Sequence, residues 1–156
     1  MITLAIDPGT TESGYAYYDD STGLPSESGK IPNDIMLSHV YAGNYDRIAV
    51  EMVAHYGLGM PAGKTIFETC VWIGRFQEAA TRKRFTIVYR KEVTLHMCGS
   101  VRGKDANVRQ SIMDRHGGDR SIAVGVKANP GPLYGFKADA WQALGVAITA
   151  SETKDF

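Results

Sequence analysis

Short apolar runs separated by polar turns dominate the first half of the chain. Runs this short, bounded by Gly, Pro, Asp or Ser, are typical of β-strands. The first two runs lie close enough together to form a hairpin. Strands are therefore expected at Ile2–Ile6, Gly14–Tyr18, Ser28–Ile31, Arg47–Glu51 and Phe85–Tyr89.

Longer segments with apolar residues at helical spacing separate and follow the later strands. Helices are expected at Asn33–Tyr41, Lys64–Lys83, Lys91–Met97, Lys104–His116 and Phe136–Ser151. The middle of the second helix is apolar on nearly every face. Such a helix is either buried in a large core or shared with a partner chain. The last helix is expected to be interrupted at Gly145.

Glycine and proline mark loops at His55–Gly63 and Ala128–Gly135, and no repeat or linker divides the chain. Strands that begin as a hairpin and then alternate with helices favour an α/β fold with a mixed sheet. We therefore expect residues 1–156 to form a single domain, with a mixed five-stranded sheet flanked by helices.

The charge balance excludes a global attraction to polyanions, because 17 basic residues face 17 acidic ones. Any binding of nucleic acid must rest on local basic patches. Cys70 and Cys98 have no CxxC spacing and are expected to be free, buried thiols. The chain enters a strand at once and has no apolar run long enough to span a membrane. A soluble, cytoplasmic protein is expected.

Three acids stand where strands end or where the last helix begins. Asp7 and Glu51 close two apolar strands, and Asp139 lies in the first turn of the final helix. The carboxyl ends of strands are where sites form in α/β sheets, so Asp7 and Glu51 are expected to converge. Carboxylates are the oxygen ligands of Mg²⁺, and two such ions neutralise the charge that develops in phosphodiester hydrolysis.

Each acid also has a simpler interpretation from its spacing alone. Asp7 precedes Pro-Gly and suits a turn, Glu51 suits a solvated strand end, and Asp139 suits a helix N-terminus. Spacing leaves these alternatives open.

Four motifs in order resemble the RuvC-type Holliday junction resolvases of the RNase H-like superfamily. They are IDPGTTESGYA at 6–16, AVEMV at 49–53, KDANVRQ at 104–110 and ADAWQALGVAITA at 138–150. The glycine-rich loop and the Phe67–Phe76 helix are similar to those of phage-encoded members. The resemblance spans nearly the whole chain and implies an RNase H-like fold.

The resemblance also implies that Asp7, Glu51 and Asp139 are catalytic metal ligands for two Mg²⁺ ions, with Mn²⁺ as a substitute. The family has a further acid one helical turn after the last of these. Here that position is Gln142, on the same helix face as Asp139. An amide can offer a metal one carbonyl oxygen, but it removes a negative charge.

Basic residues that are candidates for phosphate contact follow the long helix and the Phe85–Tyr89 strand. With one aromatic that could stack on a base, the candidate DNA-binding residues are Tyr56, Arg75, Arg102, Lys104, Arg109 and Lys137. Lys104 stands one position from the lysine of the family. The Phe67–Phe76 helix is a candidate seam for a homodimer, whose two-fold symmetry would suit a four-way junction.

The expected function is a metal-dependent endodeoxyribonuclease that resolves four-way or other branched DNA and leaves 5′-phosphate ends. One alternative is a junction-binding protein in which Gln142 marks a weakened site. A second is a phosphotransfer module of the actin/hexokinase type, because Asp7-Pro8-Gly9-Thr10-Thr11 also resembles that phosphate loop. Such proteins enclose a nucleotide between two domains of this kind, and this chain is too short to hold both.

Overall fold

The computed structural model describes residues 1–54, 63–81 and 83–154. Its centre is a five-stranded sheet with the spatial order β3-β2-β1-β4-β5. The five strands are β1 (Ile2–Asp7), β2 (Glu12–Asp19), β3 (Leu24–Pro32), β4 (Arg47–Met52) and β5 (Arg84–Tyr89). All five were expected from the sequence, and β3 extends well beyond the four residues predicted for it.

The sheet is mixed, as expected. β1, β2 and β3 form an antiparallel meander, while β4 and β5 add to the other side of β1 in parallel. Because β4 and β5 run parallel to β1, the carboxyl ends of these three strands meet at one edge. That edge is where the sequence places Asp7 and Glu51.

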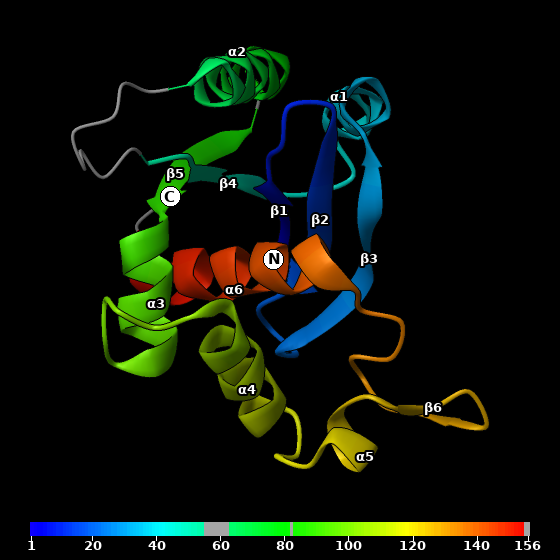
Figure 1. The fold of residues 1–156 in the computed structure, drawn as a ribbon. Coiled ribbons are helices and arrows are strands. Elements are labelled where there is room, and N and C mark those ends of the chain that lie inside the picture. The colour runs from blue at the N-terminus through cyan, green and yellow to red at the C-terminus, as the bar shows by residue number, and fades with distance from the viewer. Residues whose placement is uncertain (55–62, 82, 155–156) are drawn as a thin grey trace.

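Helices cover both faces of the sheet (Figure 1). One face packs against α1 (Asn33–Ala42) and α2 (Lys64–Ala79) through side chains such as Leu4, Ile48 and Phe76. The other face packs against α6 (Ala138–Thr153), with α3 (Arg90–Cys98) and α4 (Asp105–Arg115) outside it. No helix in the described ranges is long and apolar enough to cross a membrane.

The helix that is buried on every side is α6, with an unbroken buried run from Ala140 to Ala150. Small residues let it approach the sheet and the outer helices closely. The expected interruption at Gly145 is wrong, since α6 runs through it. A Cβ on Gly145 would lie 3.0 Å from Val108 Cγ1 and 3.3 Å from Val93 Cγ1, so the glycine serves the packing of α4 and α3 against α6.

Of the two alternatives for α2, burial in a large core is wrong for its outer face. Phe67 and Val71 are each 62% exposed, while Ile73 and Phe76 point into the core. The reason is that α2 forms the outer layer on its side of the sheet, so only one stripe of its apolar residues meets the core. The alternative, an apolar face shared with a partner chain, is left open by this arrangement.

Smaller corrections concern the thiols and the segment before α6. Cys70 is exposed and Cys98 is partly buried, so the expected pair of buried thiols is wrong for Cys70. The segment expected to be one loop contains part of a small hairpin of β6 (Gly125–Val126) and β7 (Asn129–Pro130), preceded by the short helix α5 (Arg120–Ala123). This hairpin lies away from the sheet (Figure 1).

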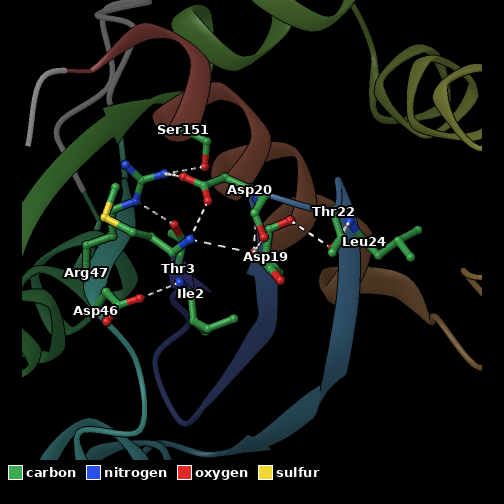
Figure 2. Close-up of polar contacts among 11 residues, drawn as sticks. Ile2, Thr3, Asp19, Asp20, Thr22, Leu24, Asp46, Arg47 and Ser151 are labelled. Atoms are coloured by element: carbon green, nitrogen blue, oxygen red, sulfur yellow. Dashed lines mark hydrogen bonds and ion pairs between the residues drawn. The ribbon is translucent and has the colours of Figure 1, made fainter.

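A buried arginine fixes the far end of α6 to the sheet (Figure 2). Arg47 at the start of β4 is only 5% exposed. Its Nε donates to Thr3 Oγ1 at 2.8 Å, and its Nη2 donates at 2.9 Å both to Asp20 Oδ2 and to Ser151 Oγ. Because Ser151 lies in the last turns of α6, these bonds help set how far along the sheet the helix reaches, and therefore where its first turn lies.

Candidate active site

Asp7 and Glu51 stand side by side at the carboxyl edge of the sheet. The parallel register pairs Ile6 with Val50, and the two acids are the next residues of β1 and β4. Ala5 and Ala49 face α6, so the alternation of strand side chains turns Asp7 and Glu51 to that same face. The predicted convergence of these two acids follows directly from this register.

The turn after Asp7 is held by α1. Asn33, which is 1% exposed, donates from Nδ2 to Gly9 O at 2.9 Å and accepts from Ser13 Oγ at 2.6 Å. Gly9 is required there, since a Cβ on it would lie 2.4 Å from Glu12 O. The Pro-Gly turn is therefore a fixed part of the site wall.

Asp139 reaches the site because Gly14 has no side chain. Gly14 of β2 is paired with Asp7, and a Cβ on Gly14 would lie 2.5 Å from Asp139 Cβ. The first turn of α6 thus rests on the strand beside Asp7. Its backbone is strained at Ala138, which has a φ of +29°, a value unfavourable for a residue with a side chain.

A lysine that the sequence analysis missed completes a row of residues across the sheet. Lys30 of β3 is paired with Gly14, and its Nζ forms an ion pair with Asp139 Oδ2 at 2.7 Å. The row runs from Lys30 through Gly14 and Asp7 to Glu51 on four neighbouring strands. Only the strand register reveals Lys30 as part of the site, because nothing in its local sequence distinguishes it from a surface lysine.

Burial holds the two central acids against ionisation, and for Asp7 the charges of neighbouring acids add to it. Burial, followed by the charges of Glu51 and Asp139, raises the pKa of Asp7 to about 8. Burial also raises the pKa of Glu51 to about 7, and the nearby Arg90 opposes that rise. Glu51 Oε2 is buried and, within the described part of the chain, has no hydrogen-bond partner. The Glu51 oxygen without a partner thus lies beside Asp7, a second carboxyl with a raised pKa. A bound cation would favour the ionised form of both carboxyls.

Two hollows open on Asp7. One, of about 290 Å³, is lined by Asp7, Glu51 and Arg90 together with Pro8, Met52, Val53, Ala54 and Ile66. The other, of about 300 Å³, is lined by Asp7, Lys30 and Asp139 together with the turn residues from Pro8 to Glu12. Asp7 therefore stands between the positions of the other two acids.

The fourth expected ligand position is occupied by a bonded amide. Gln142 is 8% exposed and accepts a hydrogen bond at Oε1 from Arg90 Nη1, while Arg90 Nη2 bonds to Asp105 Oδ1. In residues 1–54, 63–81 and 83–154, no three His, Cys, Asp or Glu side chains are gathered as a metal cluster. One contact contributes to this: Asp139 Oδ2 is turned to Lys30 Nζ, at 2.7 Å.

The predicted DNA-binding residues are divided between the two faces of the sheet. Arg102 and Lys104 are exposed in the connection from α3 to α4, and Lys137 is exposed at the start of α6. Arg109 is partly buried, with its guanidinium 5.5 Å from the centre of the Trp141 ring. Arg75 lies on α2, on the opposite face of the sheet, and stacks on Trp72 at 4.1 Å. The structure therefore does not bring Arg75 together with the others, and Tyr56 lies outside the described residues.

Comparison with known proteins shows the fold. No family model and no curated protein matches the sequence. Among solved structures, RuvC of Thermus thermophilus matches with a TM-score of 0.66 and 17% identity, over 97% of this chain and 93% of that chain. T. thermophilus RuvC in complex with a Holliday junction substrate matches with a TM-score of 0.61 and 15% identity, over 97% and 92% of the two chains. The RNase H-like fold of the RuvC type, expected from the motifs, is confirmed.

Proposed function

We propose that this protein is a metal-dependent endodeoxyribonuclease that cuts four-way or other branched DNA junctions. The observation that carries the proposal is the buried acidic edge of β1 and β4, with its unpartnered Glu51 Oε2, on a fold of the RuvC type. The solved relative in complex with a Holliday junction gives the substrate class of that protein, and we extend it to this chain.

In this proposal Asp7, Glu51 and Asp139 hold Mg²⁺, or Mn²⁺ in its place. All three offer hard carboxylate oxygens, the donors that these ions prefer, and one hollow is lined by Asp7 with Glu51 and another by Asp7 with Asp139. Bound there, the ions supply the positive charge that phosphodiester hydrolysis requires. Gln142 joins the ligands through the oxygen that it also offers to Arg90.

The residues of the chain would act as follows. Asp7 and Glu51 give up their protons when the site is filled, because the cation reverses the effect of burial on their pKa. Lys30 holds the Asp139 carboxylate in the first turn of α6 until a cation competes for it. Arg102, Lys104, Arg109 and Lys137 contact DNA phosphates on the α6 face of the sheet. The product ends would carry 5′-phosphates.

A homodimer is also part of the proposal, formed by two copies of α2. Its exposed apolar side chains are Phe67 and Val71, and Val71 lines a hollow with exposed Tyr41 of α1. A second copy would cover this surface. Arg75, on the same surface, would then lie at the seam between two protomers. Sedimentation analysis of Val71→Glu against the unaltered chain tests this, since a charge at the seam should yield monomers.

The decisive experiment is cleavage of a labelled four-way junction with Mg²⁺, with EDTA, and with the Asp7→Asn variant. The proposal expects paired nicks with Mg²⁺ alone and none in the other two reactions. Flaps and forks in parallel reactions would define which branched substrates are cut.

One observation favours a second candidate, a junction-binding protein without activity. Gln142, a neutral amide bonded to Arg90, stands where the family that the motifs resemble carries an acid. Tight junction binding without cleavage, in either Mg²⁺ or Mn²⁺, would support this candidate against the nuclease.

A further inference from the structure

We propose that Arg90 binds the phosphate that is to be cut, with its guanidinium oriented by Gln142 and Asp105. This inference rests on the proposed nuclease function and adds to it a substrate contact that the three acids cannot provide. Arg90 is the first residue of α3 and follows β5 directly. Its side chain, 22% exposed, lines the same hollow as Asp7 and Glu51.

The guanidinium is held from two sides by different elements. Gln142 on α6 accepts from Nη1, and Asp105 at the start of α4 accepts from Nη2. A guanidinium has five N–H donors in a planar fork, so these two bonds fix its plane and leave three donors for a ligand. A phosphate is the ligand that such a fork suits best.

A purely structural role fits the contacts poorly. An arginine whose task is to neutralise buried acids would bond to them, and Glu51 Oε2 is buried and unpartnered within the described residues. Arg90 instead bonds to a neutral amide and to Asp105, whose side chain is 71% exposed. The charge of Arg90 lowers the pKa of Asp7 and Glu51 by electrostatic attraction.

The position of Arg90 also joins the acids to the basic surface. A second hollow, of about 320 Å³, is lined by Arg90, Lys91, Thr94, Val101, Arg102 and Gly103. Arg90 thus belongs to both hollows. A DNA strand whose phosphates follow Lys91 and Arg102 would pass Arg90 before reaching Asp7 and Glu51.

This arrangement gives a physical reason for the amide at position 142. A glutamate or aspartate there would form an internal salt bridge with Arg90 and reduce the positive charge available to a phosphate. Glutamine holds the guanidinium through one hydrogen bond from Nη1 and adds no negative charge of its own. The departure from the acid expected at this position is then linked to the presence of Arg90.

The test compares Arg90→Gln, Arg90→Ala and Arg90→Lys with the unaltered chain, using Arg115→Gln as the control. Arg115 is an exposed arginine of α4 paired with Glu152, away from the acids. Four-way junction binding in Ca²⁺, across a range of salt concentrations, gives a measurement that requires no cleavage. The slope of the logarithm of the DNA-binding constant against log[salt] should become less steep by about 0.9 in Arg90→Gln and Arg90→Ala, because one phosphate contact is lost. The slope of the control should not change.

Cleavage in Mg²⁺ gives the second measurement. Arg90→Gln should lower kcat on the order of 100-fold while binding of Mn²⁺ alone, measured by calorimetry, stays as tight as in the unaltered chain or becomes tighter. Arg90→Lys should recover part of the rate. Added guanidinium ion should raise the rate of Arg90→Ala, whereas NaCl of equal ionic strength should not.

An unchanged salt slope together with a kcat within a few-fold of the unaltered chain would overturn the role of Arg90. So would a parallel loss of Mn²⁺ binding and thermal stability, which would make Arg90 a structural residue. Failure of the unaltered chain to cut any junction is a different outcome. It removes the nuclease proposal, while the salt slope still decides whether Arg90 contacts a phosphate.

Discussion

Asp139 rests on Gly14, so closely that a Cβ at position 14 would lie 2.5 Å from Asp139 Cβ. Gly14 is paired with Asp7 in the antiparallel ladder. This single contact joins the last helix of the chain to its first hairpin at the point where the acids meet. The acidic site therefore depends on the absence of a side chain at one strand position as much as on the acids themselves.

Replacing Gly14 with alanine should damage the site and the fold together. The added methyl group must displace the first turn of α6, which we expect to cost about 2 kcal/mol of unfolding free energy and to weaken Mn²⁺ binding. Gly74→Ala is the matched control, because a Cβ on Gly74 of α2 meets nothing within 4 Å. In the helix interior that change should instead stabilise the protein by up to about 1 kcal/mol. Urea unfolding and Mn²⁺ calorimetry check both, and equal behaviour of the two variants would contradict the packing argument.

Because the pKa values of Asp7 and Glu51 are raised, the folded protein should lose stability as the pH rises. Burial and neighbouring acids raise the pKa of Asp7 to about 8, and burial raises that of Glu51 to about 7, whereas both carboxyls ionise near pH 4 in the unfolded chain. The folded protein therefore holds more protons between about pH 4 and pH 8. The stability that these groups contribute is complete below about pH 4 and is lost progressively up to pH 8.

Asp7→Asn removes the larger of these two contributions while keeping the shape of the side chain. In the absence of metal we expect the variant to exceed the unaltered protein in unfolding free energy by up to about 5 kcal/mol at pH 8 and to lose most of that advantage at pH 4.5. Mg²⁺ should stabilise the unaltered protein at pH 8 and have little effect on the variant. Urea unfolding at the two pH values, with and without Mg²⁺, measures this. If the difference in unfolding free energy between the two proteins is the same at both pH values, Asp7 does not have a raised pKa in the folded state.

The end of α6 opposite the acids offers a test of how the helix is positioned. Arg47→Met removes the buried guanidinium that bonds Thr3, Asp20 and Ser151. We expect a loss of about 2 kcal/mol, since Asp20 keeps the N-terminal amine as a partner at 2.6 Å. Arg115→Met breaks the exposed pair with Glu152 and should cost less than about 1 kcal/mol. Equal losses in the two variants would mean that Arg47 does not anchor α6.

The sequence was sufficient for the strands and for two of the acids because local patterns encode them. Apolar runs defined β1 and β4, and an acid at the end of each parallel strand must come to the same edge, which places Asp7 beside Glu51. Asp139 needed more than a pattern: its position relative to the strands depends on the contact with Gly14. The family resemblance supplied that link, and the spacing alone did not.

Lys30 and the role of Arg90 were beyond local patterns for the same physical reason. Lys30 joins the site only through the register of β3 with β2. The strand predicted from the sequence covered only half of the residues of β3 that pair with β2. Arg90 was recognisable from the sequence only as one of several basic residues after β5. Its bonds to Gln142 and Asp105 span 52 and 15 residues of chain. The degree of burial of α2 and α6 was likewise set by their layer in the fold, not by their composition.

Gln142→Glu tests both the metal site and the inference about Arg90, because the two predict different effects. The added carboxylate lies one turn from Asp139 on the same face of α6, so the Mg²⁺ concentration required for half-maximal cleavage should fall. The same carboxylate would pair with Arg90 and withdraw its charge from the phosphate, so the maximal rate should fall as well. The Mg²⁺-induced rise in melting temperature should become larger, since the extra charge binds the ion more tightly. Gln142→Met, which offers neither charge nor amide oxygen, is the matched comparison. It should lower the maximal rate by freeing the guanidinium and raise the Mg²⁺ concentration required, because a ligand oxygen is lost. Metal titrations of the cleavage rate, with thermal melts of each variant, supply the measurements. If Gln142→Glu leaves the metal requirement, the maximal rate and the melting shift all unchanged, Gln142 acts on neither the ions nor Arg90, and the site ends at Asp139.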